Sequence, residues 1–85
     1  KYRAALQFDQ RKESTMSDHV YKLIEVVGSS KLGSDDAIRN AIETAAKTVR
    51  HISWFEVLET TGHVTDDKVA FFQVRLKVGF RIEAE

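Results

Sequence analysis

The sequence predicts one α+β domain of element order β-α-β-β, in which a three-stranded antiparallel sheet wraps on one amphipathic helix. Three observations lead to this fold class. A Val-, Ile- and Leu-rich run at 19–28 ends at a glycine, apolar residues recur every three to four positions through 37–49, and two alternating segments flank an acidic turn near residue 66. Because the chain has only 85 residues, we expect a single core.

Composition excludes several classes of partner and chemistry. Thirteen basic residues balance thirteen acidic ones, so no net field attracts nucleic acid or an anionic membrane. The chain has no cysteine, which excludes disulfides and thiolate chemistry. No apolar run approaches the ~18 residues of a membrane span, and the first residues lack the apolar stretch of a signal peptide. We therefore expect a cytoplasmic protein.

The chain divides near residue 15. Residues 1–15 contain no methionine, whereas Met16 and the polar residues after it are typical of a natural start. We expect residues 1–15 to be an N-terminal extension or appended peptide, and residues 16–85 to be the folded domain. Apolar residues of the extension recur at helical spacing, but we expect an isolated helix of this length to be marginal in water.

The first strand and the start of the helix are predicted from local signals. Residues 19–28 are rich in β-branched residues and precede a run of turn formers. Ser34 is the expected N-cap, and Asp35 and Asp36 occupy the first turn, where the helix dipole favours carboxylates. Capping accounts for this acidic pair, so it does not indicate a metal site.

The helix is predicted from its apolar stripe and spans about four turns. Lys47, Arg50 and His51 are expected at its C-terminal end, where cations complement the dipole. Four alanines allow it to approach the sheet closely. The stripe consists of Ala37, Ile38, Ala41, Ile42, Ala45, Ala46 and Val49.

The hairpin alternates strictly in its second arm, which fixes the two faces of the sheet. With a turn at Asp66 and Asp67, Trp54 faces Gly79 and Thr60 faces Gln73, all on the side away from the helix. Glycine leaves the space above it empty. The same side also carries the cations Arg75, Lys77 and Arg81.

Trp54 on this outer side has two interpretations. The strands extend far beyond one helix, and Leu58, Val69 and Phe71 join Trp54 in an apolar patch that would be exposed in a monomer. Such a patch predicts an oligomer, with Trp54 as an interface anchor. The alternative is that Trp54 stacks on a ligand.

No pattern indicates an enzyme. His19, His51 and His63 are widely separated and lack metal-ligand spacing, so neither a metal site nor a catalytic residue is predicted. The glycines of 28–33 match neither a dinucleotide-binding nor a Walker pattern. We interpret the histidines as surface or interface residues.

Several segments together resemble the dodecin family of small flavoproteins. They are "MSDHVYKLIEVVGSS", "DDAIRNAI", "TVRHISWFEV" and "FFQVRLKVGFRIE", which cover Met16 to Glu83. The resemblance implies a β-α-β-β chain of which twelve copies build a hollow shell, a homododecamer. It also implies that two flavin rings stack as a pair between tryptophans, here Trp54, and that a glutamine, here Gln73, bonds the polar edge of the ring.

The resemblance assigns the remaining candidates as well. Bacterial relatives favour FMN, with riboflavin or FAD as alternatives, and Arg81, with Lys77 as the weaker candidate, is the cation that would meet a phosphate. Some relatives also hold coenzyme A, although no residue here carries that site over. Many members have aspartate before the tryptophan, where this chain has Ser53, so the departure bears on flavin affinity.

Two functions follow. The first is storage, sequestration and photoprotection of flavin, since a stacked tryptophan quenches the excited ring. The alternative is a structural self-assembling shell that displays residues 1–15 in many copies. Flavin binding with quenched fluorescence distinguishes the first from the second.

Overall fold

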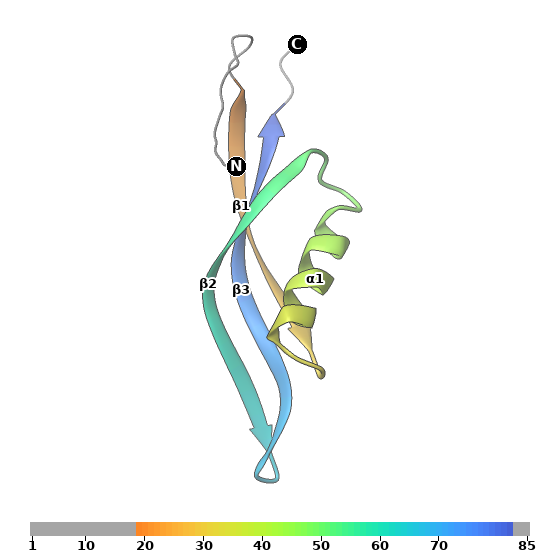
Figure 1. Ribbon diagram of the computed structural model, residues 1–85, viewed down its shortest axis with the longest axis vertical. Helices are drawn as coiled ribbons and strands as arrows, with labels where there is room; N and C mark the ends of the chain where they lie inside the picture. The colour runs from red at the N-terminus through yellow and green to blue at the C-terminus, as the bar shows by residue number, and fades with distance from the viewer. Residues whose placement is uncertain (1–18, 83–85) are drawn as a thin grey trace.

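The computed structural model describes residues 19–82 and confirms the β-α-β-β prediction (Figure 1). Strand β1 spans Val20–Ser30, helix α1 spans Ser34–Ala45, β2 spans Ile52–Thr65 and β3 spans Lys68–Ile82. The antiparallel sheet has the order β1-β3-β2, so β3 is central and pairs along most of its length. The extension expected at 1–15 lies outside the described residues.

The core is small and lies between α1 and β3. Val74, Leu76 and Val78 of β3 are fully buried beneath Ala37 and Ala41 of the helix. These two small side chains let the helix backbone approach the sheet, as the alanine stripe predicts. Five buried apolar residues within 19–82 are few for a domain of this length, so folding leaves much apolar surface uncovered.

Gly28 of β1 is the point of closest approach between helix and sheet. A Cβ atom at this position would overlap the carbonyl oxygen of Ala37 and lie 2.8 Å from the Cβ of Ala41. Only a residue without a side chain fits there.

The prediction that Ser34 caps the helix was wrong, because the helix begins one residue earlier. Gly33 is the N-cap, and its carbonyl accepts the first helical bond from the Ala37 N–H at 3.0 Å. Asp36 in the first turn accepts a hydrogen bond from Ser30 Oγ at 2.7 Å. The acidic pair thus stabilises the helix start, and Asp36 also ties it to the end of β1.

The helix also ends earlier than predicted. It stops at Ala45 with no basic residue in its last turn, so Lys47, Arg50 and His51 lie in the connection to β2. The chain tightens at this point, since the N–H groups of Lys47 and Thr48 each bond a carbonyl three residues earlier.

The hairpin turn forms as predicted. Asp66 and Asp67 have φ angles of 54° and 63°, which match a two-residue turn whose twist suits antiparallel strands. Thr65 pairs with Lys68 on either side of it.

The register beyond the turn is confirmed near Trp54 and was wrong near Gln73. Trp54 pairs with Gly79 as predicted, whereas Thr60 pairs with Val74 and Thr61 takes the place opposite Gln73. Register shifts at His63/Val64 and at Val57/Glu59 cancel each other between the turn and Trp54. Bulges insert single unpaired residues, which strict alternation does not reveal.

The molecule is elongated and thin, with extents of 56, 28 and 16 Å. The hairpin tip extends well past the helix (Figure 1). The accessible surface is 5841 Å², whereas a compact monomer of the whole chain's mass would expose about 5,100 Å². The sheet therefore has more surface than its single helix can cover.

Replacing Gly28 by alanine tests the close packing of helix on sheet. We expect Gly28→Ala to lower the stability of the folded protein by about 1–3 kcal/mol, because the new methyl group overlaps backbone. Chemical denaturation measures this change. Gly62→Ala is the matched control, since its Cβ would meet only the Phe71 carbonyl oxygen at 3.6 Å. Equal stability of the two variants would contradict this packing.

Candidate functional site

The side of the sheet away from α1, here called the open face, carries the candidate residues. Register and alternation assign its members. They are Tyr21, Leu23, Glu25, Val27 and Ser29 of β1; Trp54, Glu56, Glu59, Thr61 and His63 of β2; and Phe71, Gln73, Arg75, Lys77, Gly79 and Arg81 of β3.

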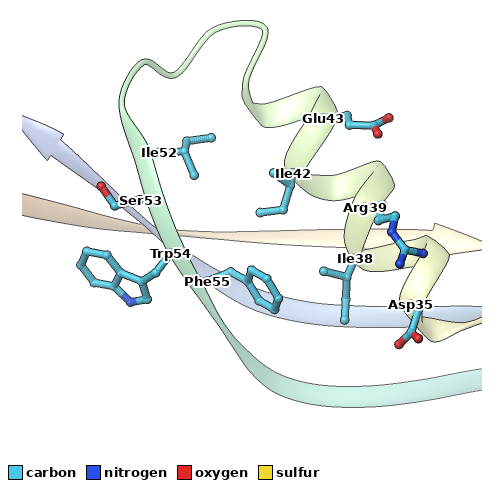
Figure 2. Close-up of a pocket in the computed structure, with 9 residues that line it drawn as sticks. All are labelled: Asp35, Ile38, Arg39, Ile42, Glu43, Ile52, Ser53, Trp54 and Phe55. Atoms are coloured by element: carbon cyan, nitrogen blue, oxygen red, sulfur yellow. The ribbon is translucent and has the colours of Figure 1, made fainter. Parts of the chain in front are cut away.

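The indole of Trp54 lies over Gly79. A Cβ at Gly79 would be 2.5 Å from three atoms of the indole, so glycine is required beneath it. Tyr21 of β1 reaches the same place from the other side of β3 and meets the indole edge-on, with ring centroids 5.3 Å apart. Trp54 points away from the helix, whereas Phe55 points toward it (Figure 2). With 43% of Trp54 exposed, the indole can receive a further flat ring.

A local irregularity in β2 sets the position of Trp54. Ser53 is the unpaired residue of a register shift between Ile52 and Trp54, and His51 before it has a φ of 64°. The His51 carbonyl accepts bonds from the Arg81 N–H at 3.0 Å and from Ser53 Oγ at 3.3 Å. Serine at the position before the tryptophan therefore has a structural role in this chain.

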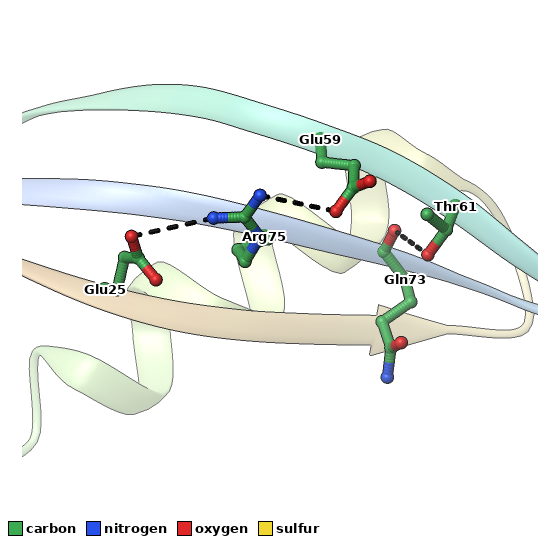
Figure 3. A network of polar contacts seen from close by, with 5 residues as sticks. All are labelled: Glu25, Glu59, Thr61, Gln73 and Arg75. Carbon is green, nitrogen blue, oxygen red and sulfur yellow. Dashed lines mark hydrogen bonds and ion pairs between the residues drawn. The ribbon is translucent and has the colours of Figure 1, made fainter.

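The middle of the open face is occupied by paired charges. Arg75 lies 3.6 Å from Glu25 on β1 and 3.4 Å from Glu59 on β2, so one guanidinium bridges all three strands (Figure 3). Lys77 is aligned between Glu25 and Glu56 in the register. Arg75 is thus ion-paired within the sheet, and two carboxylates flank Lys77.

Gln73 lies on the other side of Arg75 from Trp54. Its main-chain carbonyl accepts a hydrogen bond from Thr61 Oγ1 at 3.3 Å (Figure 3). The amide oxygen lies 3.4 Å from Nε2 of His63. His63 in turn contacts the ring of Phe71, with centroids 4.4 Å apart.

Trp54 and Gln73 are too far apart to meet the same ligand in one chain. Trp54 lies at Gly79, six positions along β3 from Gln73. At ~3.3 Å per residue, that separation is roughly 20 Å, longer than the fused rings of a flavin. Arg81, two positions from Gly79, lies at the Trp54 end, and Lys77 lies between the two ends.

A groove of about 510 Å³ runs along the opposite side of β2, between that strand and α1 (Figure 2). Phe55 in its wall is 47% exposed. The sheet thus presents apolar surface on both faces, not only on the outer one. The lining residues are Asp35, Ile38, Arg39, Ile42, Glu43, Ile52, Ser53, Trp54 and Phe55.

Within residues 19–82 there is no cluster of three or more His, Asp or Glu side chains arranged to hold a metal ion. In the same part of the chain, no helix has the length and apolar character needed to cross a membrane.

Comparison with known proteins identifies the family. A family model described as Dodecin matches residues 20–83. The chain belongs to the dodecin family. The dodecin of Thermus thermophilus is 48% identical over 64 residues, which is 75% of this chain and 93% of the relative.

Solved dodecin structures have the same fold. The dodecin of Streptomyces coelicolor is 48% identical, with a TM-score of 0.78 over 82% of this chain and all of the other. The dodecin of Streptomyces davaonensis is 44% identical, with the same TM-score over 80% of this chain and again all of the other. The resemblance inferred from the sequence segments is therefore confirmed.

Sequence reasoning missed three contributors to the candidate site. Tyr21 shares a face with Trp54 by alternation alone, but its contact depends on the strand order, which the sequence does not state. His51 has a left-handed backbone conformation, which a sequence usually signals with glycine rather than histidine. His63 reaches Gln73 only because of the unpredicted register shift beside it.

Alanine at Gly79 tests whether the indole position depends on the missing side chain. We expect Gly79→Ala to displace the ring and change tryptophan emission and near-ultraviolet circular dichroism, because the chain has a single tryptophan that reports on this site. Gly62→Ala should leave both signals unchanged. Parent-like spectra for a folded Gly79→Ala variant would refute the packing of Trp54 on Gly79.

Proposed function

We propose that this dodecin assembles as a closed homododecamer that binds flavin on its open face, and that it stores and sequesters the flavin and protects it from light. In this proposal two flavin rings stack as a pair between the Trp54 side chains of neighbouring chains. Gln73 bonds the polar pyrimidine edge of the ring. Family membership supports flavin binding and oligomeric assembly in general.

The observation that carries the proposal is the way in which the indole of Trp54 is held in place. The indole is held from below by Gly79 and at its edge by Tyr21, and nearly half of its surface remains exposed. An aromatic plane held in this way loses little freedom on stacking, and stacking stabilises a pair of rings by ~0.5–1.5 kcal/mol beyond area burial. Contact with an electron-rich indole also quenches an excited flavin.

The separation of Trp54 and Gln73 supports a site shared between chains. One chain offers a stacking residue at one end of the open face and a hydrogen-bonding amide at the other, roughly 20 Å away. A ligand that touches both residues must take them from different copies. Flavin binding and assembly are therefore linked in the proposal.

Charge on the open face bears on the choice of flavin. Arg81 lies at the Trp54 end, where the phosphate of FMN would meet a forked guanidinium. Lys77 lies between two carboxylates, which makes it the weaker candidate. We propose FMN as the preferred ligand, with riboflavin and FAD as alternatives.

Other expectations remain predictions. Coenzyme A has no assigned residues in this chain. The alternative function, a shell that displays residues 1–15, depends on a segment outside the described part of the structure. No observation favours it, so we retain the flavin proposal. A binding rather than catalytic role and a cytoplasmic location belong to the same proposal.

Two substitutions separate stacking from hydrogen bonding. Trp54→Ala should remove most of the flavin affinity together with the quenching, because the aromatic plane is lost. Gln73→Leu should weaken binding roughly ten- to a hundredfold and leave quenching at saturation unchanged, since an unpaired polar edge costs ~1–3 kcal/mol. Fluorescence titration with FMN measures affinity and quenching in one experiment.

The control is Thr60→Ala, which changes the residue beside Thr61 on the other face and should bind as the parent does. Sedimentation must show the same oligomer for every variant. Parent-like binding by Trp54→Ala would make Trp54 an interface anchor only. Parent-like binding by Gln73→Leu would remove the amide from the site.

A further inference from the structure

His63 is a polar contact of Gln73 that the proposed site does not use. Its Nε2 atom lies 3.4 Å from Oε1 of the Gln73 amide, on the open face. The two side chains are diagonal neighbours, because His63 pairs with Phe71 and Thr61 pairs with Gln73. The register shift between His63 and Val64 precedes this pair and helps to aim the imidazole.

The surroundings hold both partners in place. The imidazole packs on the ring of Phe71 at 4.4 Å between centroids, with planes inclined by 42°. The main chain of Gln73 is tied to Thr61 by the bond from Oγ1. The torsions of the Gln73 side chain therefore decide where its amide lies, and His63 is the group that meets its oxygen.

A glutamine amide can present either of two ends to a ligand. The flavin pyrimidine edge alternates acceptors and a donor, so an amide must face it with the correct end. Because an amide oxygen can only accept, the contact between Nε2 of His63 and Oε1 of Gln73 is a hydrogen bond in the His63 tautomer that carries its hydrogen on Nε2, and it leaves the amide N–H groups and one lone pair of Oε1 available. An amide turned the other way would offer its N–H to the imidazole instead.

We infer that His63 is a positioning residue for flavin, which fixes the orientation of the Gln73 amide from within the same chain. The inference rests on the proposed function, since it assigns Gln73 to the flavin edge.

Two replacements of His63 test the inference with riboflavin, which carries no phosphate to titrate. His63→Phe keeps a ring on Phe71 but removes the N–H, and should weaken binding roughly three- to tenfold, the usual value of one hydrogen bond. Quenching at saturation should not change. His63→Gln keeps an N–H donor at this position, so it should retain more of the affinity than His63→Phe does.

A double-mutant cycle separates positioning from a general effect on the hairpin. In a Gln73→Leu background, His63→Phe should have no further effect on affinity, because its partner is already absent. Additive losses, or equal affinities of His63→Phe and the parent, would overturn the inference.

A measurement without ligand distinguishes this inference from the proposed function. The side-chain amide signal of Gln73, identified by its loss in Gln73→Leu, should shift between the parent and His63→Phe, because the amide oxygen loses its hydrogen-bond donor. Riboflavin binding without that shift would overturn the role of His63 alone. The shift without riboflavin binding would overturn the proposed function, and with it the role of His63 toward flavin.

Discussion

The fold depends on one short helix packed on a much longer sheet. Twelve residues of α1 cover the middle of β3, whose fifteen residues extend beyond the helix (Figure 1). The packing is close where it exists, since Gly28 and two alanines allow backbone to approach backbone. Among the described residues it leaves five apolar side chains buried in the core, and it exposes apolar side chains on both faces. Association with further copies would bury this exposed apolar surface.

The same constraint explains how the candidate site is divided. On the open face, the length of β3 separates the indole of Trp54 from the amide of Gln73, and the ion-paired Arg75 lies between them. Neither end is a closed pocket in one chain. In the proposed function, the stacking surface and the hydrogen-bonding amide come together where the open faces of different copies meet. In this account the contacts that stabilise the oligomer also complete the binding site.

The sequence predicts the repeated features of this molecule well and its irregular ones poorly. Strand alternation and a glycine were enough to pair Trp54 with Gly79, because the two intervening register shifts cancel. They do not cancel at Gln73, where the expected partner Thr60 is replaced by Thr61. The helix start was misassigned by one residue, since Gly33 and Ser34 are both suitable caps. Contacts across the sheet, such as Tyr21 with Trp54, require the strand order as well.

The most direct test of a site shared between chains is complementation in mixed assemblies. Trp54→Ala and Gln73→Leu subunits, each defective alone, are co-expressed with different tags, and particles that carry both tags are isolated. If the site takes its indole and amide from different copies, a subset of sites regains parent affinity and quenching of FMN. If both residues serve one site within a chain, no site in the mixed particles binds as the parent does, and the account fails.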